Sequence, residues 1–198
     1  MSTTPGAAPQ GRYVVALSAY AIAETYLGLE EVEGAGSNPL IVGMLKQDAP
    51  WLAGGDEIPW CAAFVNHVAA RIPGMPRSKK LNARSWLAVG QDVRLPDAKV
   101  GFDVVVLSRG VGAPGANVLD APGHVGFYGG WRAAAGRPSE VLVLGGNQGD
   151  AVTAAWFPAA RILGIRRCLP PNVLLQVRAA GEPLRDGFAQ GASSPKTD

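Results

Sequence analysis

The sequence predicts an α+β fold in which helices come first and an antiparallel sheet follows. Apolar residues recur at helical spacing up to about residue 90, and short β-branched runs punctuated by Gly, Pro, Asn and Asp follow Pro96. Helices that precede strands, rather than alternate with them, are typical of this class. The chain has 198 residues, 47% hydrophobic and 17% charged, which suits one domain with a hydrophobic core.

Two helices are expected at the beginning of the chain. Residues 12–27 carry apolar side chains at helical spacing, and Gly28 marks a stop. Asn38 and Pro39 are typical of an N-cap and of the first position of a helix, which we expect to run to about Leu45.

A third helix is expected to begin near Trp60, after a loop that ends in proline, and a shorter one at 83–89, stopped by Gly90. One face of the third helix carries apolar residues at helical spacing: Cys61, Phe64, Val65, Val68 and Ile72.

Four short apolar runs in the second half predict strands, at 103–107, 124–128, 141–144 and 162–165. We expect the folded domain to span residues 12–178. Residues 1–11 are expected to be a flexible N-terminal segment and residues 179–198 a flexible C-terminal tail.

The charge and the ends of the chain narrow the function classes. A formal net charge of +2 is too small to predict nucleic-acid binding. The N-terminus resembles no signal peptide, and no apolar run reaches the roughly twenty residues that cross a bilayer. We therefore expect synthesis in the cytoplasm and no membrane insertion. The two cysteines and two histidines do not have the spacing of a zinc site, so no metal is expected.

Cys61 is the first candidate for chemistry. It falls in the first turn of the expected helix, where free backbone N–H groups and the helix dipole lower the pKa of a thiol. The same N–H groups can stabilise an oxyanion. The alternative is that Cys61 is a small buried hydrophobe, because it begins an apolar stripe. Cys168, with no histidine nearby in sequence, is interpreted as structural.

A thiolate nucleophile needs a base, and the chain has only two histidines. His67 lies six residues after Cys61, about 240° around the helix axis and about 9 Å along it, so it does not easily reach the thiol. His124 opens a predicted strand directly after a turn and is the remaining base. A hydrogen-bonded histidine at a strand end is the alternative interpretation.

A polar group that orients the imidazole is expected near the end of the following strand. Asn147 is best placed, because a hairpin would bring the ends of the two strands together. Gln148 is a neighbouring candidate. From spacing alone, an ordinary Gly-Gly-Asn turn explains the segment better than an orienting role does.

The motifs WCAAFVN (60–66), ARSW (83–86), GHVGFY (123–128) and LGGNQ (144–148) together resemble the NlpC/CHAP superfamily of papain-like cell-wall hydrolases. The resemblance covers residues 13–168 and is greatest to a branch of small phage and prophage proteins. One departure is that Phe102 separates a Gly and an Asp that are adjacent in the family.

The resemblance implies a papain-like fold with the nucleophile at a helix N-terminus, packed on an antiparallel sheet that carries the base. It implies Cys61 as nucleophile, His124 as base and Asn147 as third polar residue. A further set is implied to support the site or contact substrate: Trp60, Asp56, Gln148 and Glu31.

The function implied is hydrolysis of amide bonds in the peptide stem of peptidoglycan, as an endolysin-like endopeptidase or amidase, through a thioester on Cys61 and without a cofactor. We expect a monomer that is delivered to the wall by a holin, a virion or a secretion machine. Two alternatives remain open: an effector or amidase that acts on protein, and a wall-binding phage component without catalysis.

Overall fold

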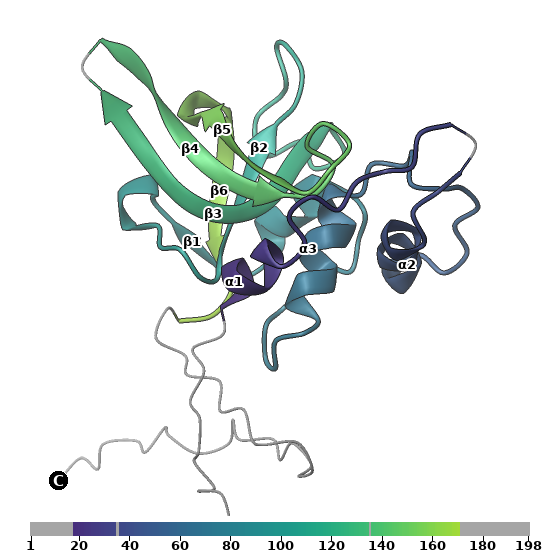
Figure 1. Cartoon of the computed structure of the whole chain (residues 1–198). Helices are drawn as coiled ribbons and strands as arrows, with labels where there is room; N and C mark the ends of the chain where they lie inside the picture. The colour runs from purple at the N-terminus through teal and green to yellow at the C-terminus, as the bar shows by residue number, and fades with distance from the viewer. Residues whose placement is uncertain (1–17, 35, 135, 171–198) are drawn as a thin grey trace, which may run out of the picture. The chain divides into compact units, whose positions relative to one another are not determined.

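A six-stranded antiparallel sheet and the helices packed on it make up the computed structural model, which describes residues 18–34, 36–134 and 136–170 (Figure 1). The fold is mixed α+β, as the sequence predicts. The domain boundaries expected near residues 12 and 178 lie outside the described residues.

Three α-helices and three short 3₁₀ helices lie in the described part of the chain. The helices are α1 (Ala19–Glu24), α2 (Pro39–Asp48), α3 (Cys61–Ala69), η1 (Ala83–Ala88), η2 (Leu95–Asp97) and η3 (Ala159–Arg161). Residues 12–17 of the first expected helix lie outside the described residues, and the rest of it ends at Glu24 rather than at 27. The segment expected as a short helix at 83–89 is the 3₁₀ helix η1.

The expected N-cap of α2 is confirmed. The Asn38 side-chain oxygen accepts a hydrogen bond of 3.0 Å from the backbone N–H of Leu40, and Pro39 occupies the first turn. The Asn38 side chain accepts from a backbone N–H that has no partner within the helix, and Pro39 has no backbone N–H that needs a partner.

The sheet has the order β1-β6-β2-β3-β4-β5, and all its pairs are antiparallel. Its strands are β1 (Gln91–Val93), β2 (Asp103–Ser108), β3 (Gly123–Ala134), β4 (Arg137–Gly145), β5 (Thr153–Pro158) and β6 (Ile162–Arg167). The four expected strands are β2, β3, β4 and β6. β1 and β5 at the two edges were not predicted.

Helix α3 lies against one face of the sheet, with α2 packed on its far side (Figure 1). All nine residues of α3 are buried. The rings of Phe64 on α3 and Phe127 on β3 meet edge to face, with centroids 6.4 Å apart. This packing fixes the beginning of α3 over the beginning of β3.

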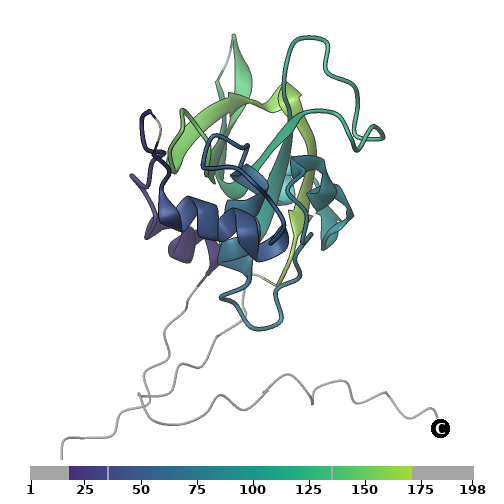
Figure 2. The same ribbon diagram turned by 90° about the vertical axis from the view of Figure 1, so that its right-hand side faces the viewer.

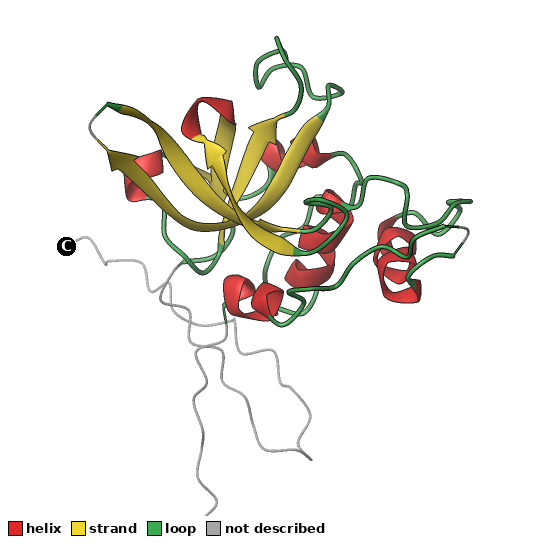
Figure 3. Cartoon of the chain, turned by 45° about the horizontal axis from the view of Figure 1, so that its top comes forward, coloured by secondary structure: helices red, strands yellow, loops and turns green. Residues whose placement is uncertain are grey.

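The opposite face of the sheet has its own apolar cluster, built on Val105, Leu107, Tyr128, Val141, Val143 and Ile165. Residues of β1 and η2 pack against it. The sheet is strongly curved in both Figure 2 and Figure 3, so that its strands bend around this cluster. No helix in the described part of the chain is long and apolar enough to cross a bilayer.

Candidate active site

Cys61 is the first residue of α3, directly after Trp60, and only 3% of its surface is exposed. The backbone N–H of Val125, on β3, donates to its sulfur, as does that of Ala62. The helix therefore presents its first side chain to the beginning of β3, where His124 lies.

The pKa of the Cys61 thiol is raised above its ordinary value, because burial disfavours the thiolate. The hydrogen bonds from Val125 and Ala62 and the charge of Arg109 lower it, but burial outweighs them. The sequence led us to expect a lowered pKa for this thiol, and that expectation is corrected. The N-terminal N–H groups act in the expected direction, yet a sequence gives no measure of how deeply a side chain is buried.

His124 is the second residue of β3 and pairs with Leu107 of β2. Its side chain is 6% exposed, and its ring lies 5.6 Å from that of Phe157, centroid to centroid. Its Nε2 lies 2.8 Å from Oε1 of Gln148, which follows β4. The imidazole is thus held between an aromatic ring and an amide.

The hydrogen bonds of Gln148 fix the tautomer of His124. The amide nitrogen of Gln148 donates to the backbone carbonyl of Thr153 at 2.6 Å, and to the hydroxyl of the same residue at 3.1 Å. Because a carbonyl can only accept, the nitrogen end of the amide must face Thr153, and its oxygen must face the imidazole. Nε2 of His124 therefore carries the hydrogen, and Nδ1 keeps the lone pair that a general base uses.

Burial lowers the pKa of His124 to about 4. The hydrogen bond that His124 donates to Gln148 opposes this shift, whereas the charges of Arg109 and Arg161 add to it. At neutral pH the imidazole is uncharged, which is the form that can accept a proton.

The structure brings Cys61 to the strand residue that follows His124, and Arg109 acts electrostatically on both side chains. No hydrogen bond joins the thiol and the imidazole among the interactions of the described residues. The resting site therefore consists of a neutral thiol and a neutral imidazole at the junction of α3 and β3.

Asn147, expected beside His124, instead donates from its amide to the Glu31 carboxylate at 2.9 Å. The same carboxylate oxygen accepts the indole N–H of Trp60 at 2.7 Å. The residue at the imidazole is Gln148, one position later. Glu31 links the loop after β4 to the residue before Cys61, which gives Glu31, Trp60 and Asn147 a supporting position.

Gly146 explains why this loop can lie so close to α3. A Cβ atom at this position would overlap the Trp60 ring and crowd Phe64. Asn147 follows with φ of +58°, a left-handed conformation that Asn tolerates better than most residues. The sequence Gly-Asn is therefore required by the approach of the loop to the helix.

Asp56 is buried and supports the loops in front of α3. Its carboxylate accepts from the backbone N–H of Asn38 at 2.7 Å and from that of Val32 at 2.9 Å. These hydrogen bonds, that of Asn38 first, hold the pKa of Asp56 below its ordinary value. Of the two roles considered for an acidic residue here, loop support agrees with these contacts.

The second histidine and the second cysteine lie away from this junction. His67 is buried, with Nε2 3.2 Å from the Tyr26 hydroxyl and Nδ1 3.2 Å from Oε1 of Gln47. Cys168 is also buried, and burial raises its pKa to about 12. Both cysteines are free thiols. These contacts agree with structural roles for His67 and Cys168.

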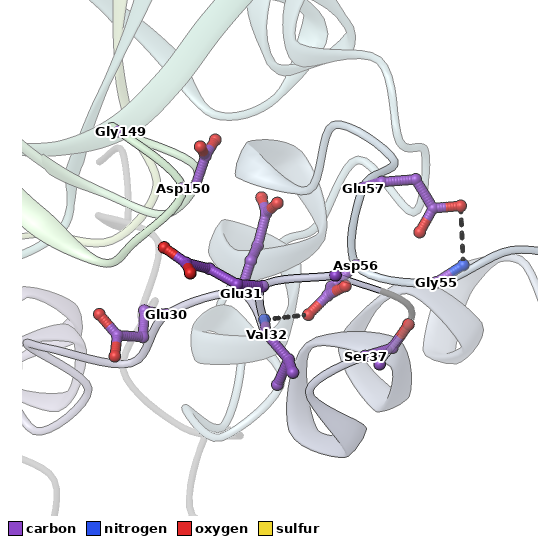
Figure 4. Close-up of a pocket in the computed structure, with 12 residues that line it drawn as sticks. Glu30, Glu31, Val32, Ser37, Gly55, Asp56, Glu57, Gly149 and Asp150 are labelled. Atoms are coloured by element: carbon purple, nitrogen blue, oxygen red, sulfur yellow. Dashed lines mark hydrogen bonds between the residues drawn. The ribbon is translucent and has the colours of Figure 1, made fainter.

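An acidic groove of about 730 Å³ lies between the segment that contains Glu31 and the loop after β4, which contributes Gly149 and Asp150. Figure 4 shows Asp150 and Glu57 on opposite walls of it, with Glu31 between them. Its lining includes the carboxylates of Glu30, Glu31, Glu33, Asp56, Glu57 and Asp150.

A second cavity, of about 400 Å³, lies beside His124. Two arginines line it, Arg109 after β2 and Arg161 at the end of η3, together with Phe157 of β5. Sequence reasoning missed these residues, as well as Thr153. Arg161 directly precedes the strand predicted at 162–165, and Arg109 lies two residues after the strand predicted at 103–107, which is the only signal that could have indicated them. Thr153 and Phe157 lie in the unpredicted strand β5.

Comparison with protein-family models gives no match, and comparison with curated proteins gives none.

Proposed function

We propose that this protein is a papain-like cysteine hydrolase of the NlpC/CHAP type that cleaves amide bonds in the peptide stem of peptidoglycan. The observation that carries the proposal is the junction of α3 and β3. There, a thiol at a helix N-terminus accepts a hydrogen bond from the backbone N–H of Val125, the residue that follows His124. The hydrogen-bonded nitrogen of the His124 imidazole is fixed, and its Nδ1 keeps a lone pair. The motifs around Cys61 and His124 resemble those of the superfamily, and the proposed substrate class is taken from this resemblance.

The proposed reaction begins with the neutral pair. Nδ1 of His124 takes the proton of the Cys61 thiol as sulfur attacks the amide carbonyl carbon, and backbone N–H groups near the start of α3 stabilise the oxyanion. The imidazolium then gives its proton to the departing amine, which leaves a thioester on Cys61. A water molecule loses a proton to His124 and attacks the thioester, and the carboxylic acid product leaves as Cys61 regains its proton.

A neutral resting pair is compatible with this scheme, because the proton moves during the attack rather than before it. The Gln148 oxygen stabilises the imidazolium once it forms, since it accepts from Nε2 in both charge states. Gln148 is therefore proposed to take the orienting position that the resemblance implied for Asn147.

Digestion of purified sacculi tests the proposal. The wild-type protein, Cys61→Ala and the control Cys168→Ala are incubated with Gram-negative and with Gram-positive sacculi, and soluble products are identified by mass spectrometry. Wild type and Cys168→Ala should release stem fragments, and Cys61→Ala should release none. Equal release by Cys61→Ala would reject Cys61 as the nucleophile.

A second candidate is a wall-binding protein without catalysis, favoured by the burial of Cys61 and the raised pKa of its thiol. Binding to sacculi with no release of fragments, together with equal reactivity of Cys61 and Cys168 toward a small thiol-selective electrophile, would favour this candidate.

A further inference from the structure

We propose that the cavity beside His124 is an anion subsite, in which Arg109 and Arg161 bind a carboxylate of the substrate. The inference rests on the proposed function for the identity of the substrate and adds how that substrate is oriented. Free carboxylates are present along the peptide stem of peptidoglycan, so the chemistry of the ligand matches the proposed polymer.

Arg161 is held in place by the protein itself. Its Nε and Nη2 donate to the carbonyl oxygen of Ser108 at 3.0 and 2.8 Å, and its guanidinium lies 5.3 Å from the centroid of the Phe157 ring. It forms no ion pair with an acidic side chain of the described residues. A guanidinium that is fixed in position and not neutralised by a carboxylate is suited to bind an external anion.

Arg109 begins the loop after β2 and is exposed. It makes no hydrogen bond or ion pair with the other described residues, whereas Arg94, Arg132, Arg166 and Arg167 each pair with a carboxylate. It lines the same cavity as Arg161. The two arginines thus present donors to one space.

The rest of the cavity lining favours an anion as well. It contains no acidic residue: beside the two arginines are His124, Asn147, Gln148, Gly149, Thr153, Ala155 and Phe157. The acidic groove, which is also lined by Gly149 of the loop after β4, repels a carboxylate. A substrate that carries a carboxylate on one side of its scissile bond is therefore directed to the basic side, beside His124.

Anion binding also affects the base. The charges of Arg109 and Arg161 oppose protonation of His124, together with its burial, while the Gln148 hydrogen bond favours it. A bound carboxylate offsets the two positive charges and so makes the imidazolium less unfavourable when the substrate is in place.

The test is a binding measurement on full-length Cys61→Ala protein, so that no cleavage occurs. A synthetic stem tetrapeptide with free carboxylates and the same peptide with carboxamides are titrated by calorimetry. The carboxylate form should bind about tenfold or more tightly, since charge-assisted hydrogen bonds are among the stronger polar interactions.

Arg161→Gln and Arg109→Gln should each remove most of this preference, and Arg94→Gln should leave it unchanged. Arg94 is the matched control, because it is exposed and pairs with Asp97 outside the cavity. Arg109→Gln removes no contact with the described residues, so it tests the subsite even if Arg161→Gln fails to fold. Equal binding of the two peptides, or a preference that survives Arg109→Gln in folded protein, would overturn the proposal.

The binding measurement and the digestion of sacculi test the anion subsite and the proposed function separately. If sacculi are cleaved but the preference does not depend on the arginines, the subsite is rejected and the hydrolase stands. If sacculi remain intact while the arginine-dependent preference persists, the subsite stands and the substrate is another carboxylate-bearing amide.

Discussion

At the scale of single residues, the chemistry of the site depends on a chain of hydrogen bonds that ends on the main chain. Thr153 fixes Gln148, Gln148 fixes the Nε2–H tautomer of His124, and Nδ1 is thereby left as a base. Each step follows from which atoms can only donate or only accept. The group that orients the His124 imidazole is thus the uncharged amide of Gln148.

Replacing Gln148 tests this chain directly. Gln148→Leu keeps a similar volume but cannot accept from Nε2–H, so the tautomer and ring orientation of His124 are no longer fixed. We expect kcat for stem cleavage to fall about 10²-fold, since a correctly placed general base contributes 10²–10⁴. Rates measured on a synthetic stem peptide give the comparison.

The matched control is Gln47→Leu, which removes the glutamine beside the other histidine, His67. It should change kcat by less than about twofold, because His67 lies away from the proposed site and acid–base catalysis needs contact with the reacting groups. Equal losses in the two variants would contradict the role given to Gln148.

The positions of Cys61 at a helix start and of His124 at a strand start were predictable from the sequence, but the partners of these side chains were not. Cys61 and His124 followed from a helix start, a strand start and the shortage of other histidines. Asn147 and Gln148 are adjacent, and the sequence does not give the left-handed conformation of Asn147, whose side chain contacts Glu31 while that of Gln148 contacts His124. The raised pKa of Cys61 depends on burial from several elements at once, which no local pattern records.

At the scale of elements, the packing of α3 on β3 brings the proposed nucleophile, Cys61, to the beginning of the strand that carries the proposed base. Phe64 and Phe127 lie at its centre, and both are fully buried. The helix is short, at nine residues, so tertiary packing rather than helix propensity must stabilise it.

Phe64→Ala should therefore lower the free energy of unfolding by about 3–5 kcal/mol, the usual cost of removing a buried phenylalanine. Urea unfolding monitored by circular dichroism measures it. Trp51→Ala is the control, because Trp51 is 79% exposed and should cost less than about 0.5 kcal/mol. A loss as small as the control's would mean that α3 is not held by this contact.

The loop that leads from β2 into His124 is held by one buried arginine. Arg84 of η1 donates to the carbonyls of Pro114, Gly115, Val118 and Pro122 at 2.7–3.1 Å. Figure 2 shows this loop, in teal, extending away from the sheet. A single planar guanidinium thus satisfies four main-chain acceptors just before the proposed base.

Arg84→Met should release this loop and cost about 2 kcal/mol, because the carbonyls lose charge-assisted partners while the volume is nearly kept. Amide hydrogen exchange should rise at 109–122 and stay unchanged in α2, which serves as the internal reference. Arg84→Lys should not restore protection, since one ammonium group cannot reach four carbonyls. Protection retained in both variants would contradict this role.

The sequence predicted most elements but not the edges of the sheet. β2, β3, β4 and β6 have the apolar runs of strands buried in a sheet. β1 has only three residues, and β5 has three small residues followed by Trp156, Phe157 and a proline, so neither has such an apolar run. Because β5 supplies both Thr153 and Phe157, missing it concealed the cavity beside His124.

At the scale of the whole molecule, the buried neutral histidine links stability to pH. The pKa of His124 is about 4 in the folded protein, against an ordinary value of 6.5 that applies to the unfolded chain. Below pH 6.5 the unfolded chain binds a proton that the folded protein does not bind. Stability is therefore lost as the pH falls from about 6.5 to about 4, and is unaffected by this group above that window.

Between pH 6.5 and pH 5 the contribution of His124 to this loss is about 2 kcal/mol, at about 1.4 kcal/mol per pH unit. Urea unfolding of wild type and His124→Asn at several pH values isolates the contribution of His124. The free energy of unfolding of the variant should depend less steeply on pH, whatever its value at pH 7. His67, whose pKa is also lowered to about 4 by burial, keeps its own contribution in that variant. Parallel slopes for wild type and His124→Asn would show that His124 is not buried in its neutral form.

The proposed hydrolysis depends on one covalent step, the transfer of a stem acyl group to Cys61. The most direct measurement is intact-protein mass spectrometry after rapid acid quench of the enzyme with a synthetic stem peptide, followed by mapping of the adduct. We predict an acyl adduct on Cys61 whose mass identifies the scissile bond, with none on Cys168 and no cleavage by Cys61→Ala. Continued cleavage of the peptide by Cys61→Ala, with no adduct in wild type, would contradict the proposal that Cys61 is the nucleophile.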